Sequence, residues 1–137
     1  MLVELSNTQI ILANCLGIPL AHMGISWACE QLPRRIFEKP MPEAPTGPNQ
    51  IYTRVSGFPK ARLTSTEPTY LASFIAETRR GEFAHWLQWI VISLFIVWNP
   101  FPANLIILIY ALLLNAPCIL NLRHTRQRLI GLYRRVT

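Results

Sequence analysis

Three long apolar runs, separated by polar and charged segments, dominate the pattern of residues along the chain. They cover residues 10–28, 83–98 and 103–122. A helix that crosses the hydrocarbon core of a bilayer needs roughly 20 mostly apolar residues, a length that the first and third runs reach and the second approaches. The pattern therefore predicts an all-α membrane protein with three transmembrane helices, in which residues 1–137 form a single membrane domain.

Residues 67–82 predict an amphipathic helix at the membrane interface that leads directly into the second span. Thr66 can cap its N-terminus, and Pro68 suits its first turn. Apolar residues recur at the spacing of one helix face: Leu71, Phe74 and Ile75. The charged residues of this segment lie off that face, as is typical of a helix that lies at a membrane surface.

The remaining segments are polar, and each predicts a different kind of connection. Prolines recur through residues 29–66 and exclude a long helix or a central strand, which indicates a Pro-rich cytoplasmic connection. Within it, residues 51–63 fit a short strand or hairpin without determining one. Residues 99–102 are too few for anything but a tight turn, so spans two and three should be antiparallel. Residues 123–137 predict a basic amphipathic C-terminal helix on the membrane surface.

Small and polar residues inside the spans predict how the helices pack. Membrane helices approach closely along stripes of such residues, and one stripe follows the third span: Asn104, Ala111, Asn115 and Cys118. Pro19 and Pro117 are expected to kink their helices. His22 is expected to be a neutral imidazole bonded to a neighbouring helix, with a pigment or metal ligand as the alternative.

The charge of the chain, +6, agrees with a membrane location. Its 13 Lys and Arg residues lie either between residues 34 and 80 or between residues 123 and 135. They adjoin apolar spans and accompany no nucleic-acid-reading motif, so anionic lipid headgroups are the expected partner and nucleic acid is not. The positive-inside rule then predicts a multi-pass membrane protein with its N-terminus outside and its C-terminus in the cytoplasm.

The three cysteines predict neither a disulfide framework nor a metal site. Cys15, Cys29 and Cys118 lie in or at the edge of apolar runs, without a CxxC pair or metal-ligand spacing to a histidine. The first residues carry no basic segment and no clear cleavage site, so we expect the first apolar run to be retained in the protein.

Arg79, Glu82 and His85 form the grouping that predicts chemistry. On a continuous helix, Glu82 and His85 share one stripe with Thr78 and Trp89, at spacings of 4, 3 and 4 residues. Arg79 can pair with Glu82, and Glu82 can hold the imidazole of His85. A histidine oriented by a carboxylate is an effective general base. We therefore expect His85 and Glu82 to be catalytic residues at the cytoplasmic membrane surface.

Further residues are expected beside this grouping, because the turn at residues 99–102 folds the third span back along the second. We expect substrate to be bound by five residues: Arg79, Trp86, Asn115, Arg123 and Arg126. The chain has no Ser or Cys nucleophile motif and no phosphate loop, and it contains no Asp, which excludes the HxxxxD arrangement of many lipid acyltransferases. A charged membrane boundary, with a salt bridge and a histidine anchor, is the non-catalytic interpretation of the same residues.

The runs IAETRRGEFAHW and YALLLNAPCILNLRHTRQRL resemble the glycosyl-diaponeurosporenoate acyltransferases over residues 75–135. The family pattern is close to ETKRAExxHW, an N-x-P element and QRYNRxRL. The positions that match it are Glu77, Thr78, Arg79 or Arg80, Glu82, His85, Trp86, Asn115, Pro117, Arg123, Arg126, Arg128 and Leu129. The chain departs from the pattern at Leu122, His124 and Thr125, where the family has Gln, Tyr and Asn.

This resemblance implies a small bacterial membrane enzyme that transfers a fatty acyl chain to the sugar hydroxyl of a glycosylated carotenoid or similar lipid. Acyl-CoA, the glycosylated carotenoid and membrane lipid would be its partners. No cofactor is expected to be required, although the spans suit a bound carotenoid or lipid. The alternative, from a different class, is a non-catalytic helical subunit of a larger photosynthetic or respiratory complex that packs against it through the same fold.

Overall fold

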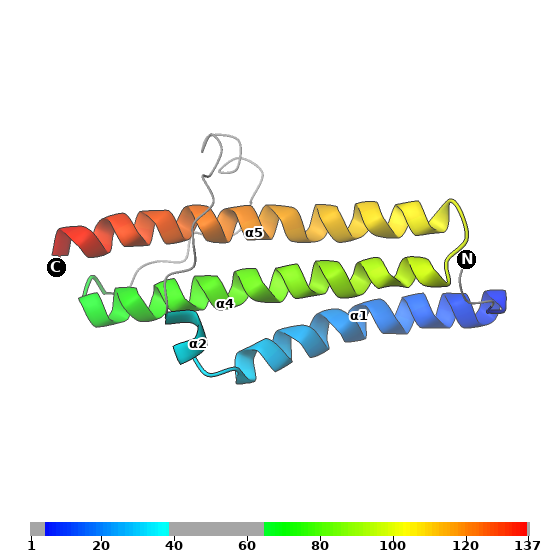
Figure 1. The fold of residues 1–137 in the computed structure, drawn as a ribbon, viewed down its shortest axis with the longest axis horizontal. Helices are drawn as coiled ribbons and strands as arrows, with labels where there is room; N and C mark the ends of the chain where they lie inside the picture. Colours follow the sequence, from blue (N-terminus) through cyan, green and yellow to red (C-terminus); the bar gives the residue numbers. More distant parts are fainter. Residues whose placement is uncertain (1–4, 39–64, 137) are drawn as a thin grey trace. The chain divides into compact units, whose positions relative to one another are not determined.

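The computed structural model describes residues 5–38 and 65–136, and these residues are helical throughout apart from short connections. The elements in chain order are α1 (Asn7–Gln31), α2 (Arg35–Glu38), α4 (Pro68–Ser93), the 3-10 helix η1 (Leu94–Val97) and α5 (Ala103–Val136) (Figure 1). These ranges contain no strand, which confirms the all-α class for them. Most of the predicted connection at 29–66, including residues 51–63, lies outside the described residues.

The chain divides into two compact units, and the two long helices α4 and α5 contribute to both. The first unit comprises Met1–Gln31 and Ala84–Ala116, and the second comprises Leu32–Phe83 and Pro117–Thr137. The first therefore contains α1 and the tight turn before α5, whereas the second contains α2 and the basic end of α5.

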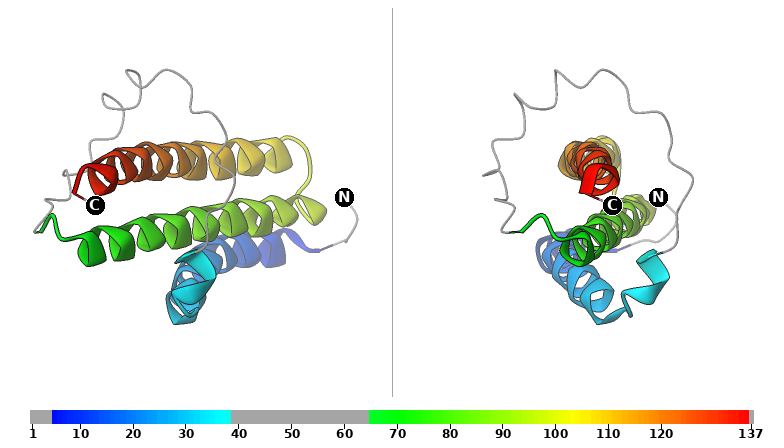
Figure 2. Two further views of the ribbon diagram at one scale, coloured as in Figure 1. Left: turned by 60° about the vertical axis from the view of Figure 1, so that its left-hand side comes forward. Right: turned by 90° about the vertical axis from the view of Figure 1, so that its left-hand side faces the viewer.

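The first unit is built around a small apolar core. Its buried residues come from α4, η1 and α5, with partly buried side chains packed against them: Ile92, Phe95, Ile107 and Ala111, then Ile18, Trp89 and Trp98. Within this unit α5 lies beside α4 and runs in the opposite direction (Figure 2). The predicted turn at residues 99–102 therefore joins two antiparallel helices, as expected.

Amide side chains join α1 to the rest of the first unit. Asn14 and Asn99 exchange two hydrogen bonds, Nδ2 to Oδ1 in each direction, at 2.7 and 3.1 Å. Farther along α1, the Nε2 group of Gln88 donates to the carbonyl oxygen of His22 at 3.2 Å and to Ser26 Oγ at 2.9 Å. Such interhelical hydrogen bonds are the usual way for membrane helices to associate when apolar surface alone supplies little specificity.

The helix of the predicted second span does not stay α-helical to its end. The α-helix stops at Ser93, and the next residues tighten into η1 before the turn. Such 3-10 turns are frequent at helix C-termini. Here the side chain of Asn99 donates from Nδ2 to the carbonyl oxygen of Phe95 at 2.7 Å, which satisfies one of the carbonyls that a helix end leaves without a partner.

The helices extend beyond the predicted spans at several points. α1 is longer than the predicted 10–28 at both ends and runs through Pro19. α5 continues without a break from the third span into the predicted tail at 123–137, with Pro117 inside it. A change from apolar to basic residues alters the surroundings that a helix prefers but does not end it, because arginine is itself a good helix former.

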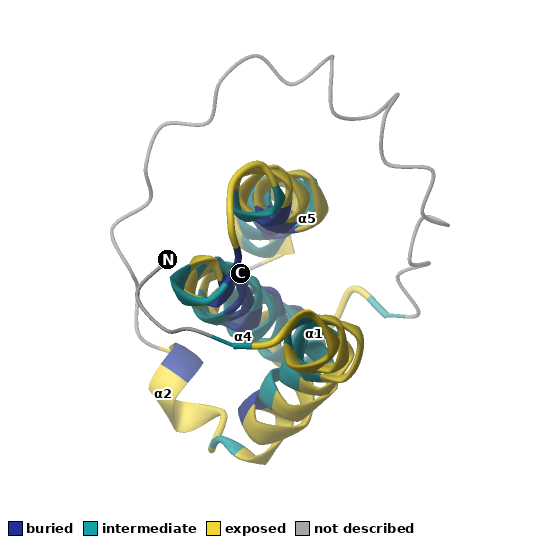
Figure 3. Ribbon diagram, turned by 90° about the vertical axis from the view of Figure 1, so that its right-hand side faces the viewer, coloured by how far each residue is buried: buried dark blue, intermediate teal, exposed yellow. Residues whose placement is uncertain are grey.

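Many apolar side chains of the first unit point outward, and Figure 3 shows exposed positions along α1. On α1 the large exposed apolar residues are Ile11, Leu12, Leu16, Leu20, Met23 and Trp27. Among the described residues, α1 and α5 are each long and apolar enough to cross a membrane. The predicted second span, 83–98, does not meet that standard, because the charged residues of α4 precede Phe83 and its α-helix ends at Ser93. These observations suggest membrane association.

The second unit has its own buried contacts. Leu71 of α4 and Leu129 of α5 are almost fully buried. Phe37 of α2 is buried against Phe83, with 5.9 Å between the ring centroids. α2 therefore belongs to this unit through an aromatic contact, although it is only one turn long.

Two glycines of α1 provide a matched test of the packing in the first unit. A Cβ atom on Gly17 would lie 2.9 Å from Phe95 Cε1, whereas one on Gly24 would meet no described atom within 4 Å. We expect Gly24→Ala to stabilise the protein by up to about 1 kcal/mol, because alanine is the better helix former. Gly17→Ala should instead lower the free energy of unfolding by roughly 1–3 kcal/mol through overpacking. Thermal unfolding in detergent measures both, and equal midpoints for the two variants would contradict the packing of α1 against Phe95.

Candidate functional site

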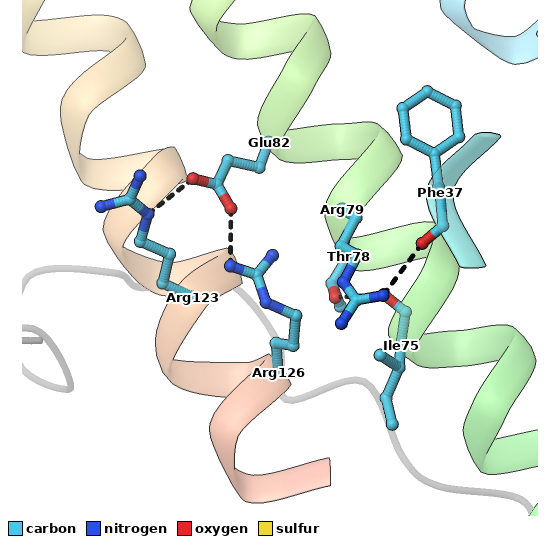
Figure 4. A network of polar contacts seen from close by, with 7 residues as sticks. All are labelled: Phe37, Ile75, Thr78, Arg79, Glu82, Arg123 and Arg126. Carbon is cyan, nitrogen blue, oxygen red and sulfur yellow. Dashed lines mark hydrogen bonds and ion pairs between the residues drawn. The ribbon is translucent and has the colours of Figure 1, made fainter. Parts of the chain in front are cut away.

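Glu82 is paired with two arginines in the second unit (Figure 4). Arg123 Nε lies 2.5 Å from Glu82 Oε1, and Arg126 Nη2 lies 2.8 Å from Glu82 Oε2. Arg123 and Arg126 are three residues apart on α5, so their side chains leave the same face of the helix. Each carboxylate oxygen thus has its own guanidinium partner, and the cluster retains one positive charge.

The two arginines keep Glu82 ionised. Burial acts on this carboxyl most strongly and would raise its pKa. The hydrogen bonds and charges of Arg123 and Arg126 together outweigh burial, and they hold the pKa of Glu82 below its ordinary value. The residue therefore serves as a fixed negative charge at neutral pH.

A glycine allows the helices to approach closely at this level. A Cβ atom on Gly81 would lie 3.2 Å from Leu122 Cδ1, which is tighter than ordinary van der Waals contact. Gly81 precedes Glu82, and Leu122 precedes Arg123. α4 and α5 therefore pack closely in the second unit at the level where Glu82 pairs with both arginines.

The other charged residues of α4 hold α2 and its surroundings in the second unit. Arg79 Nη1 donates to the carbonyl oxygen of Phe37 at 3.1 Å (Figure 4). It also donates to the carbonyl oxygen of Glu38 at 3.2 Å. Glu77 pairs with Arg80 and, at 2.8 Å, with Arg34. Arg79 thus satisfies carbonyls at the end of α2, and its predicted pairing with Glu82 stays a prediction.

His85 belongs to the first unit and has a partner that spacing along α4 did not suggest. Its Nδ1 atom lies 3.0 Å from Oδ1 of Asn115, which is 1% exposed. Asn115 was expected to bind substrate, and the prediction that Glu82 holds the imidazole stays a prediction. The available signal for the His85–Asn115 contact was the turn at residues 99–102, which folds the asparagine of α5 back toward α4.

Trp86 is the remaining predicted site residue, and it also lies in the first unit. It is 37% exposed, and its ring centroid lies 5.1 Å from that of Trp89. Two adjacent indoles provide an apolar surface with polar N–H groups, as is common where proteins meet the membrane interface. In the described part of the chain, no three His, Cys, Asp or Glu side chains gather as metal ligands would.

Replacing Glu82 tests its ion pairs against the more exposed pair that Glu77, on the same helix, forms with Arg34. The side chains of Glu82 and Arg126 are 12% and 8% exposed, whereas those of Glu77 and Arg34 are 28% and 59% exposed. Glu82→Gln should lower the free energy of unfolding by roughly 3 kcal/mol, because it leaves the buried guanidinium group of Arg126 without a counter-charge. Glu77→Gln should cost less than about 1 kcal/mol. Similar losses in detergent unfolding experiments would refute this ranking.

The pKa of Glu82 also predicts the response to acid. Because the folded pKa lies below the ordinary value of 4.5, the ionised carboxylate contributes stability that is complete above that pH. This contribution is lost as the pH falls through the lower pKa of the folded state. We expect unfolding of the wild-type chain to become easier below pH 4.5 with a steeper slope than that of Glu82→Gln. Parallel acid profiles would show that the carboxylate is not held by the arginines.

Comparison with known families agrees with the resemblance seen in the residues. The family model described as glycosyl-4,4'-diaponeurosporenoate acyltransferase matches residues 43–135, which is more than half of the chain. A search of curated proteins gives no match, and a search of solved structures gives none. The matched segment includes all seven residues predicted to form the site. The chain therefore belongs to the glycosyl-4,4'-diaponeurosporenoate acyltransferase family.

Proposed function

We propose that this protein is an integral membrane acyltransferase that esterifies the sugar hydroxyl of a glycosylated carotenoid or similar lipid with a fatty acyl chain. The family match supports an acyltransferase-like role in carotenoid glycoside modification. The observation that carries the chemical proposal is the hydrogen bonding of the two ring nitrogens of His85. Its Nδ1 atom lies 3.0 Å from Asn115 Oδ1, so Nε2 is the ring nitrogen outside this hydrogen bond.

In the proposed reaction, His85 acts as the general base through Nε2. It accepts the proton of the sugar hydroxyl while the hydroxyl oxygen attacks the carbonyl carbon of an acyl thioester such as acyl-CoA. A carbon–oxygen bond forms and the carbon–sulfur bond breaks. The proton then passes from His85 to the departing thiolate, so the histidine is regenerated and no cofactor is consumed.

The arginine pair is proposed to bind the acidic part of the acyl donor. Arg123 and Arg126 share the single negative charge of Glu82, so the cluster keeps one positive charge at neutral pH. Guanidinium groups bind phosphates well because their N–H donors form a planar fork. In this proposal Glu82 orients the two guanidinium groups.

Arg79 and Trp86 are proposed to contact substrate in different ways. Arg79 holds the end of α2 through its carbonyl oxygens, and its positive charge would favour an anionic donor. Trp86 presents an exposed indole, which suits the apolar chain of a carotenoid or the face of a sugar ring.

The membrane arrangement is part of the proposal. Three spans would place both basic segments of the chain on the cytoplasmic side, with the N-terminus outside and the C-terminus in the cytoplasm. The outward apolar side chains of α1 and α5 support contact with lipid acyl chains. A water-soluble thioester and a membrane-dissolved acceptor would then meet at the cytoplasmic surface of a bacterial inner or intracytoplasmic membrane.

Replacing His85 tests the mechanism. His85→Ala removes the general base, and we expect kcat for acyl transfer to fall roughly 10²-fold or more. The variant should still insert into membranes and accumulate, because the side chain makes one described hydrogen bond. Product formation is measured by mass spectrometry in membranes supplied with acyl-CoA and a glycosylated carotenoid.

His22→Ala is the matched control. His22 is another histidine of the first unit, and it contributes a ring contact with Tyr110, at 6.5 Å between centroids. This control should retain acyl transfer. If His85→Ala forms product at the wild-type rate, His85 is not the base. If it instead changes only assembly with other membrane proteins, the non-catalytic subunit becomes the better account.

A further inference from the structure

The side-chain amide of Asn115 has both of its ends engaged in hydrogen bonds within the first unit. Its Nδ2 group donates to the carbonyl oxygen of Ala111, one turn earlier on α5, at 2.9 Å. Its Oδ1 atom faces His85 Nδ1 at 3.0 Å. A backbone carbonyl can only accept a hydrogen bond, so the NH₂ end must face Ala111 and the oxygen must face the histidine.

This orientation determines which nitrogen of His85 carries the proton. An amide oxygen can only accept, so the hydrogen bond at Nδ1 requires Nδ1 to be protonated. In a neutral imidazole the other nitrogen then has a lone pair and no proton. We infer that Asn115 is a positioning residue that holds neutral His85 in the Nδ1–H tautomer and leaves Nε2 as the basic atom.

The inference gives Asn115 a role different from the substrate contact that its sequence position suggested. Asn115 is 1% exposed, and both of its polar atoms have partners in the protein. An amide accepts the hydrogen bond from His85 without burying a charge. A carboxylate at the same place would have to be desolvated among apolar neighbours such as Ala111. The catalytic meaning of the tautomer rests on the proposed function, whereas the tautomer itself does not.

The first test is a nuclear magnetic resonance spectrum of the wild-type protein in detergent, with ¹⁵N in its histidine rings. The chain has three histidines, and the signals of His85 are those that disappear in His85→Ala. At a pH where this ring is neutral, we expect a protonated Nδ1 and an unprotonated Nε2. A neutral His85 with its proton on Nε2 would overturn the inference without any variant of Asn115.

Variants of Asn115 then test the positioning role. Asn115→Leu removes the acceptor, so both tautomers of His85 should be populated and kcat should fall by at least about tenfold with little change in KM. Asn115→Asp keeps an oxygen acceptor and should restore the Nδ1–H signal and part of the activity. Asn104→Leu is the control, since it makes the same substitution in the same helix, where Asn104 bonds the neighbouring N–H of Leu105.

The results separate this inference from the proposed function. A mixed tautomer in Asn115→Leu with wild-type kcat would overturn the positioning role. An Nδ1–H tautomer that depends on Asn115, in a protein whose wild-type form transfers no acyl group, would support the geometry and remove the proposed reaction. If Asn115→Asp does not accumulate, the wild-type spectrum and Asn115→Leu still decide the matter.

Discussion

Polar side chains on the long helices pair with partners on neighbouring helices, and these pairs organise the described structure, although His22 Nε2 is buried without a hydrogen-bond partner among the described residues. In hydrocarbon, a polar group without a partner costs several kcal/mol. The protein avoids this cost with a few specific pairs: Asn14 with Asn99, Gln88 with Ser26, His85 with Asn115, and Glu82 with two arginines. Each pair joins residues far apart in the sequence, so these contacts determine which faces of the helices meet.

Much of the helical organisation was predictable because it follows from local rules. Long apolar runs form helices, four residues between two such runs form a turn, and residues three apart share a helix face. The boundaries were less predictable. The basic segment after Leu122 differs in polarity from the apolar run, yet α5 continues through it, because arginine and leucine both favour the helix. In the 3-10 turn before Trp98, the side chain of Asn99 bonds the carbonyl oxygen of Phe95, a contact that periodicity does not predict.

At the candidate site, too, contacts within one helix are predictable from the sequence, whereas contacts between helices are not. Spacing along one helix reveals only the neighbours on that helix, so it suggested Glu82 as the partner of His85. The structure adds partners from α5, namely Asn115 for His85 and the two arginines for Glu82. Choosing among the polar residues of α5 required the register between the helices. In the second unit, α4 and α5 pack closely at Gly81, where a side chain would crowd Leu122.

We propose that this chain, as a member of its family, catalyses acyl transfer. The most direct measurement is to purify the protein into lipid vesicles with a glycosylated carotenoid, add an acyl-CoA, and follow both products by mass spectrometry. The account predicts an acylated carotenoid glycoside and free coenzyme A in equal amounts, at a rate proportional to the protein. Intact acceptor and intact thioester, with a folded protein in the vesicles, would contradict it.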